Sequence, residues 1–283
     1  MGEIIDGKKI AQLVRAEVAE GVLALKEKTG AVPHLAVVLV GDDPASQVYV
    51  GHKERDAAEV GIDSITHRMA ADTAEGEVTT LIDRLNADRA VHGILVQLPL
   101  PGHINTEAVI ERIAPAKDVD GITPENFGRL LMSEAFLEPC TPSGIMELLR
   151  RYGVAVKGKS AVIIGRSNIV GKPIALMLMR EHATITICHS RTTDLARHVS
   201  DADILVAATG KPRMIEGPWI KEGAVVIDVG INRMPDGKLV GDVDFDGAKE
   251  RASLITPVPG GVGLMTRAML LGNTLKAAGR ALS

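Results

Sequence analysis

Short runs of consecutive apolar residues alternate along the chain with stretches in which apolar residues recur at helical spacing. The runs lie at residues 35–40, 94–98, 161–164, 184–188, 204–208, 225–229 and 254–255. Helical spacing is clearest over residues 46–60 and 75–86, and again after Thr266. Continuous apolar strands separated by helices are typical of a parallel sheet that helices cover on both faces. The pattern therefore predicts the α/β class.

The rhythm restarts near Thr141-Pro142-Ser143, where Pro142 and Ser143 could open a helix. We therefore predict two domains, with a boundary at this point. An N-terminal α/β substrate domain would span residues 1–141, and a Rossmann-like nucleotide domain would span residues 142–265. The C-terminal helix, residues 266–283, is expected to return to the first domain.

Composition narrows the class of function. Apolar residues make up 46% of the 283 residues but aromatic residues only 2%. The core must therefore consist mainly of aliphatic side chains, and the few aromatic residues are candidates for specific roles. The net charge of -4 gives no basic face for nucleic acid. Cys140 and Cys188 have no disulfide or metal-ligand spacing, which fits a reducing cytoplasm, and no metal is expected. No signal peptide and no bilayer-spanning run is visible, so no membrane is expected.

A glycine-containing turn follows the apolar run 161–164. The segment Gly165-Arg166-Ser167-Asn168-Ile169-Val170-Gly171 leads into a helix from Pro173. A strand, a glycine turn and a helix in this order direct backbone N–H groups at a phosphate. The spacing differs from G-x-G-x-x-G, and an ordinary strand-to-helix turn is the alternative. Four more strand-like runs follow, which favours a dinucleotide site.

The residues after the second strand of this domain indicate the cofactor. NAD-specific sites usually have an acidic residue there, whereas this chain has Cys188-His189-Ser190-Arg191. Ser190 and Arg191, together with Arg166, are suited to a 2′-phosphate, so we predict NADP. A surface turn capped by Arg191 is the alternative. The loops 208–210 and 230–232 would either border the cofactor or simply end their strands.

Polar residues of the first domain form a second candidate group. Tyr49 and Lys53 are four residues apart on a predicted helix and share a face. A partly buried lysine has a lowered pKa and becomes a usable acid or base, and Tyr49 offers a flat face to a ring. A solvated lysine and a core tyrosine are the alternatives.

Three further segments add to this group. Gln97 ends a buried run, so its amide must bond either the backbone or Lys53 and the substrate. Of Asp118 and Asp120, one is expected to cap the local turn and the other to accept hydrogen bonds from an amino-heterocycle. The loop 257–263 follows the last strand and is expected to close over the junction of substrate and cofactor.

These segments together resemble the bifunctional methylenetetrahydrofolate dehydrogenase/cyclohydrolase family. The resemblance rests on residues 49–53, 93–101, 117–121, 139–142, 165–171, 228–232 and 256–263, in one order along nearly the whole chain. One departure is Leu264, where the family usually has proline. The large ligase domain of some members is absent from this sequence.

The resemblance implies oxidation of methylenetetrahydrofolate with NADP, then hydrolysis of the methenyl product to 10-formyltetrahydrofolate, in one-carbon metabolism. Lys53 is then the central catalytic group, Gln97 orients it, and Tyr49 stacks on the folate. Asp120 would hold the pterin, with Pro259, Gly260 and Gly261 also at the substrate. The resemblance implies that NADP contacts Gly165, Arg166, Ser167, Ser190 and Ile231. It also implies a homodimer formed through the nucleotide domain, with tetrahydrofolate derivatives as partners.

Two other functions fit parts of the sequence. Another two-domain NADP dehydrogenase, acting on a small cyclic acid or alcohol, would share the sheet and the glycine turn. It would have no need of Lys53, Gln97 and Asp120 together. A non-catalytic NADP-binding regulator would have no use for a lysine inside a pocket. Decay of methenyltetrahydrofolate absorbance on mixing with the protein separates the three.

Overall fold

The computed structural model describes residues 2–283, which group into two compact units. Of the described residues, the first unit comprises residues 2–11 and Thr141–Thr266, and the second comprises Gln12–Cys140 and Arg267–Ser283. The division falls inside two long helices, α1 (Gly7–Thr29) and α10 (Val262–Ala281). No helix within residues 2–283 is both long and apolar enough to cross a membrane.

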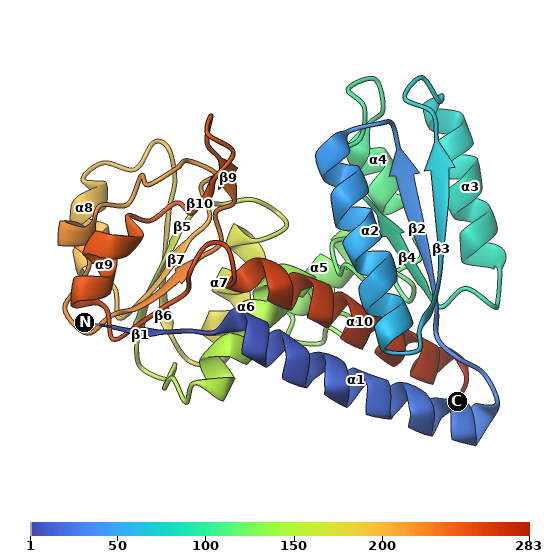
Figure 1. The fold of residues 1–283 in the computed structure, drawn as a ribbon, viewed down its shortest axis with the longest axis horizontal. Coiled ribbons are helices and arrows are strands. Elements are labelled where there is room, and N and C mark those ends of the chain that lie inside the picture. Colours follow the sequence, from blue (N-terminus) through green and yellow to red (C-terminus); the bar gives the residue numbers. More distant parts are fainter. Residues whose placement is uncertain (1) are drawn as a thin grey trace. The chain divides into compact units, whose positions relative to one another are not determined.

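The second unit is built on a three-stranded parallel sheet in the order β3-β2-β4. The helices α2 and α3 cover its two faces (Figure 1). Valine, isoleucine and alanine side chains from alternate positions of β2 and β4 pack against buried residues of α3. The element bounds are β2 His34–Val40, α2 Pro44–Glu59, β3 Asp63–Met69, α3 Glu75–Ala87, β4 Gly93–Val96, α4 Thr106–Glu111 and α5 Pro124–Leu131.

The first unit is built on a six-stranded parallel sheet in the order β1-β11-β8-β7-β5-β6. The strand order reverses at β5, because β6 pairs with one side of β5 and β7 with the other. The strand bounds are β1 Glu3–Ile4, β5 Ser160–Ile164, β6 Thr184–Cys188, β7 Ile204–Ala207, β8 Val225–Asp228 and β11 Leu254–Ile255. The other elements are α6 Cys140–Arg151, α7 Gly171–Arg180, α8 Leu195–Ser200, a 3-10 turn Gly217–Trp219, the hairpin β9 Asn232–Arg233 and β10 Leu239–Val240, and α9 Phe245–Arg251.

The predicted α/β class is confirmed, and the differences lie at particular elements. Strand β3 was not predicted, because polar residues interrupt its apolar ones and leave no apolar run. Polar residues are tolerated there because β3 lies at the edge of its sheet. The 23-residue helix α1 was missed although Ile10, Val14 and Val18 recur at four-residue spacing and are buried. The last helix begins at Val262 rather than after Thr266.

The predicted first domain begins at residue 1, whereas residues 2–11 group with the six-stranded sheet. The reason is that β1 pairs with β11 and the Ile5 amide donates to the Ile255 carbonyl at 2.8 Å. A two-residue strand has no periodicity, so only the long-range pairing reveals it.

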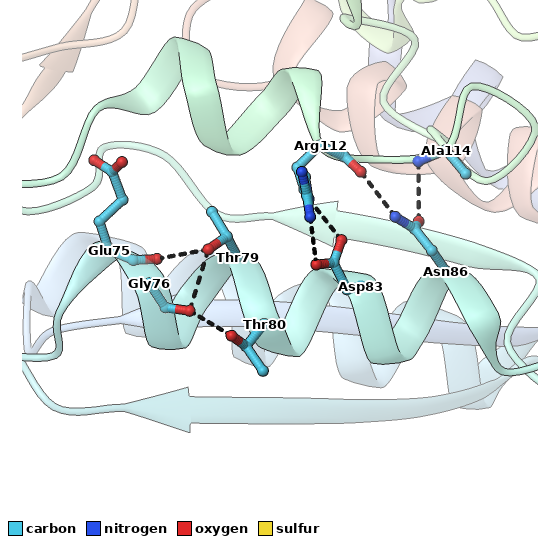
Figure 2. A network of polar contacts seen from close by, with 8 residues as sticks. All are labelled: Glu75, Gly76, Thr79, Thr80, Asp83, Asn86, Arg112 and Ala114. Atoms are coloured by element: carbon cyan, nitrogen blue, oxygen red, sulfur yellow. Dashed lines mark hydrogen bonds and ion pairs between the residues drawn. The ribbon is translucent and has the colours of Figure 1, made fainter.

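A polar network joins α3 to the segment that follows α4, as Figure 2 shows. Asn86 donates to the Arg112 carbonyl at 2.7 Å and accepts from the Ala114 amide at 2.9 Å. Arg112 also forms a two-pronged ion pair with Asp83, with N–O distances of 2.6 and 2.7 Å. The network fixes the chain that continues to Asp118, which forms an isolated bridge with Ile94 of β4.

Candidate active site

Helix α2 carries both Tyr49 and Lys53. Its N-terminus is capped by Asp43, whose carboxylate accepts from the Ser46 amide at 2.7 Å, and Pro44 occupies the first turn. Tyr49 is 40% exposed, so the alternative of a core tyrosine is wrong. Lys53 lies one turn further on and is partly buried.

Gln97 makes both of the contacts that the sequence left open. Its Oε1 accepts from the Lys53 Nζ at 3.0 Å, while its Nε2 donates to the Leu98 carbonyl at 2.6 Å. The backbone contact fixes which end of the amide faces the lysine. Gln97 therefore presents an acceptor to Lys53 at the carboxyl end of β4.

The structure separates the two aspartates of the 118–121 turn. Asp118 is fully buried and accepts from the amides of Gly121 and Thr123, at 3.0 and 2.8 Å, and from the Asn126 side chain at 2.9 Å. It is the structural carboxylate. Asp120 is partly exposed and lies in the electrostatic field of Lys53. The ligand-binding role therefore stays a prediction for Asp120.

Cys140 completes this group, and sequence reasoning gave it no role. Its side chain is 1% exposed, its thiol donates to the Val119 carbonyl at 3.2 Å, and it interacts electrostatically with the Asp120 carboxylate. Burial and the neighbouring Asp120 raise the pKa of the Cys140 thiol well above its usual value, so it stays protonated. No spacing in the sequence signals this contact, because it joins residues from different segments.

Burial dominates the electrostatics of the group. The loss of solvation lowers the pKa of Lys53, and Arg267 lowers it further, whereas Asp120 and Cys140 act in the opposite direction. Burial likewise raises the pKa of Asp120, with Lys53 opposing the shift. An amine with a lowered pKa beside an amide acceptor and a carboxylate can give and take a proton near neutral pH.

The glycine turn of the six-stranded unit lies where the strand order reverses. Gly165 has a φ of +125°, and a side chain there would collide with the Ala208 carbonyl at the end of the neighbouring strand. A side chain at Gly171, the first residue of α7, would collide with the Gly165 carbonyl. Ligands of parallel α/β sheets bind at such a reversal, beyond the carboxyl ends of the strands. The turn therefore fits a dinucleotide phosphate.

The residues predicted to bind the cofactor lie on the surface around this turn. Ser167 accepts from the amides of Val170 and Gly171 at 3.2 and 3.3 Å, so its hydroxyl also shapes the turn. The side chains of Arg166, Ser190 and Arg191 are exposed. The backbone amide of Arg191 donates to His189 Nδ1 at 3.2 Å, so this local turn contact is made by the backbone of Arg191.

Two buried aspartates organise the neighbouring loops, and sequence reasoning missed their roles. Asp228 accepts from the amides of Gly230, Asp242 and Val243, each at 2.9 Å. Asp242 accepts from the amides of Thr209 and Gly210 and from the Asn232 side chain. Together they tie the loop after β7 to the loop after β8. Burial raises the pKa of Asp228 to about 6.

The loop 259–261 belongs to the six-stranded unit and not to the unit that carries Lys53. Within its own unit it packs against the start of α1, since a side chain at Gly7 would collide with the Gly261 carbonyl. Ile231 is 47% exposed, and its side chain lies beside Gly263. Tyr49, Lys53, Gln97 and Asp120 thus lie in the three-stranded unit, and the other predicted residues lie in the six-stranded unit.

One α/β unit has a glycine turn suited to a nucleotide, at the point where the strand order reverses. The other has a lysine, an amide and a carboxylate close together. These features define the class of two-domain, nucleotide-dependent α/β enzymes. Residues 5–120 match the tetrahydrofolate dehydrogenase/cyclohydrolase catalytic domain, and residues 139–282 match the NAD(P)-binding domain of the same family. The chain belongs to the tetrahydrofolate dehydrogenase/cyclohydrolase family.

Individual relatives resemble the chain over its whole length. It is 58% identical to bifunctional protein FolD of Pelobacter propionicus, over 100% of both chains, and 61% identical to that of Moorella thermoacetica, over 98% of this chain and 99% of the relative. A Campylobacter jejuni FolD crystal structure superposes with a TM-score of 0.97 at 47% identity, covering 99% of each chain. A Trypanosoma brucei FolD structure in complex with NADP and an inhibitor gives 0.95 at 42% identity, over 99% of this chain and 98% of that one.

Proposed function

We infer that this chain is a bifunctional, NADP-dependent enzyme of one-carbon metabolism. It oxidises 5,10-methylenetetrahydrofolate to the 5,10-methenyl form and then hydrolyses that product to 10-formyltetrahydrofolate. The observation that carries this function is the contact between Lys53 Nζ and Gln97 Oε1, at 3.0 Å, in a partly buried site beside Asp120.

The oxidation step requires little acid–base catalysis by the protein. Loss of hydride leaves a cationic methenyl bridge that its two flanking nitrogens stabilise, so orientation of the substrate matters most. NADP supplies the hydride acceptor when it is bound. The task of the chain is to hold the folate rings in place, for which Tyr49 offers an exposed aromatic face and Asp120 a carboxylate.

The hydration step depends on Lys53. Water must lose a proton as it attacks the methenyl carbon. When the bond from that carbon to the ring nitrogen breaks, the nitrogen must gain a proton, and the hydroxyl of the adduct loses its proton to solvent as the formyl C=O forms. A neutral Lys53 amine takes the first proton, and the resulting ammonium returns one to the nitrogen. Burial lowers the pKa of Lys53, which makes the neutral form accessible, and Gln97 holds Nζ in place.

The folate-binding domain in this proposal is the three-stranded unit, with Asp120 as the anchor for the pterin. A carboxylate accepts two N–H bonds side by side, which matches the amino group and ring nitrogen of a pterin. Burial raises the pKa of Asp120, and a donor pair of this kind would favour its ionised form. Pro259, Gly260 and Gly261 are proposed as further substrate contacts.

NADP binding is proposed for the six-stranded unit. Gly165 and Ser167 would bind the pyrophosphate through the turn and the start of α7, and Ile231 would contact the nicotinamide side. The exposed Arg166, Ser190 and Arg191 form a donor set suited to a 2′-phosphate. The alternative in which Arg191 only caps a turn predicts equal initial rates with NAD and NADP.

The test of the activity is an absorbance assay with methylenetetrahydrofolate and NADP, repeated with NAD. NADPH formation with little methenyl accumulation is expected, since one chain carries out both steps. NADPH formation with persistent methenyl product would mean that the chain has dehydrogenase activity without cyclohydrolase activity. An absence of turnover with either cofactor would contradict the proposal.

A Lys53→Met variant separates the two reactions. We expect at least a hundredfold loss of cyclohydrolase rate, because general acid–base catalysis contributes about 10²–10⁴-fold. Dehydrogenase activity should fall less, since no proton transfer by the protein is needed there. The wild-type cyclohydrolase rate should also rise with pH as Lys53 loses its proton, below the pH at which an exposed lysine titrates. Equal, small losses in both activities would contradict the assignment.

A homodimer formed through the six-stranded unit is also proposed. Strand β6 ends the sheet order, and Ile187 on it and Met179 on the adjacent α7 are 40% and 50% exposed. An exposed apolar edge of this kind is a candidate contact between copies. Sedimentation of an Ile187→Lys variant as a monomer, against a dimeric wild type, would support it.

A cytoplasmic location is proposed from the two unpaired, buried cysteines and is tested by cell fractionation.

A further inference from the structure

One buried amide of α10 reaches into the segments that hold the candidate folate site. Asn273 is 2% exposed and lies in the same unit as Lys53 and Asp120. Its Nδ2 donates to the Val119 carbonyl at 2.9 Å and to the Glu138 carbonyl at 2.8 Å. The same atom is 3.6 Å from the Cys140 sulfur.

Both carbonyls belong to the backbone that sets the position of Asp120. Val119 directly precedes Asp120, and its carbonyl also receives the Cys140 thiol at 3.2 Å. Glu138 lies two residues before Cys140, whose amide donates to the Asp120 carbonyl at 3.3 Å. One side chain, distant in sequence, thus ties the two segments that enclose Asp120.

The 118–121 turn is consequently held from two sides. Asp118 holds it from within, through the amides of Gly121 and Thr123. Asn273 holds it from α10, 154 residues away in the sequence. The two N–H groups of a primary amide suit two carbonyl acceptors, and no apolar side chain of similar size can replace them.

We propose that Asn273 is a positioning residue for the folate site, acting through the Val119 and Glu138 carbonyls on Asp120. This proposal rests on the function proposed for Asp120. Without the amide, the turn keeps its Asp118 contacts but loses the contacts that set Asp120 against Cys140 and Lys53. Misplacement of a binding group by about 1 Å can reduce activity about a hundredfold.

The neighbouring residue provides a matched control. Thr274 is also fully buried on α10, but its hydroxyl donates only within the helix, to the Leu270 carbonyl at 2.8 Å. Asn273→Ala and Thr274→Val each remove buried polar contacts from the same turn of the helix. Only the first removes contacts to the segments around Asp120.

The experiment measures KM and binding affinity for methylenetetrahydrofolate and for NADP in the wild type and in both variants. For Asn273→Ala we expect affinity for the folate to weaken at least about tenfold while affinity for NADP stays within about twofold. Thr274→Val should leave both within about twofold of the wild type. If Asn273→Ala does not fold, Asn273→Ser, which keeps one donor, should show the same selective loss in smaller degree.

A double-mutant cycle with Asp120→Ala distinguishes this proposal from its premise. If Asn273 acts through Asp120, adding Asn273→Ala to Asp120→Ala should cost little further folate affinity. Additive losses, or equal loss of NADP and folate affinity, would overturn the positioning role. If Asp120→Ala alone leaves folate affinity unchanged, the function proposed for Asp120 fails independently of Asn273→Ala.

Discussion

At the scale of single residues, two identical side chains have different roles because their surroundings differ. Asp118 and Asp120 are two positions apart, and the sequence predicted only that one would shape the turn and one would meet a ligand. The structure gives the first role to Asp118 because its carboxylate accepts from three buried donors. The binding role of Asp120 stays a prediction.

Alanine at each of the two positions tests this division. Asp118→Ala leaves buried donors without an acceptor, at about 1–3 kcal/mol each, and should clearly lower the free energy of unfolding. Asp120→Ala removes a carboxylate that burial already disfavours, so stability should change little while folate binding weakens at least about tenfold. Denaturant titration and calorimetry measure the two effects. Normal folate binding by Asp120→Ala would place the anchor elsewhere.

At the scale of elements, side-chain hydrogen bonds to the backbone matter more than exposed ion pairs. In the network of Figure 2, Asn86 bonds the backbone of two residues after α4, whereas Asp83 and Arg112 pair at the surface. Water and salt screen the surface pair, and the side chains must be ordered to form it. The amide of Asn86 takes the place of a backbone partner for the Ala114 amide and the Arg112 carbonyl.

We therefore expect Asn86→Ala to lower the free energy of unfolding by about 0.5–1.5 kcal/mol for each of its two hydrogen bonds. Arg112→Ala should leave it nearly unchanged, and any effect should disappear at high salt. Urea titrations at low and high ionic strength measure both. A larger loss from Arg112→Ala than from Asn86→Ala would contradict this ranking.

The loops at the carboxyl ends of β7 and β8 make stability depend on pH through Asp228. Burial raises its pKa from the model-peptide value of 3.8 to about 6, so between these values the native state binds more protons than the unfolded state. This contribution to stability is fully present below pH 3.8 and is lost as the pH rises through 6. The shift corresponds to about 3 kcal/mol.

The variant Asp228→Asn cannot take up this proton. Its free energy of unfolding relative to wild type should therefore be least favourable near pH 4 and should improve by up to about 3 kcal/mol by pH 7. The contributions of the other titrating groups cancel in this comparison. A difference between the two proteins that does not depend on pH would contradict the role given to Asp228.

At the scale of the whole molecule, the grouping of the chain differs from its order in sequence. The N-terminal residues complete the six-stranded sheet, and α1 then continues into the other unit. Ile5 is fully buried, and its amide bonds the Ile255 carbonyl. The first residues of the chain therefore contribute to the stability of the six-stranded nucleotide unit.

An Ile5→Ala variant tests this grouping. Truncation of a buried isoleucine costs about 2–5 kcal/mol, and the loss should appear in the six-stranded unit. NADP should then raise the melting temperature of the variant, because a ligand stabilises the unit it binds. Val22→Ala, in the part of α1 that belongs to the other unit, is the matched control. Equal rescue of both variants by NADP would contradict the grouping.

The sequence by itself determined the α/β class, the order of most buried strands and the family. These properties depend on local patterns: apolar runs of strand length, helical spacing, and motifs whose residues are consecutive. The same locality explains why Tyr49 and Lys53 were recognised as one face of a helix, since a four-residue separation fixes their relation.

Only the tertiary structure decided which residues meet across long separations. It brought Lys53 to Gln97, placed the Cys140 thiol against Asp120, and paired the first strand with β11. It also revealed the contacts of Asn273 and the linked loops at Asp228 and Asp242. These contacts have no periodicity to detect, because packing of distant segments creates them and each depends on burial that the folded chain alone provides.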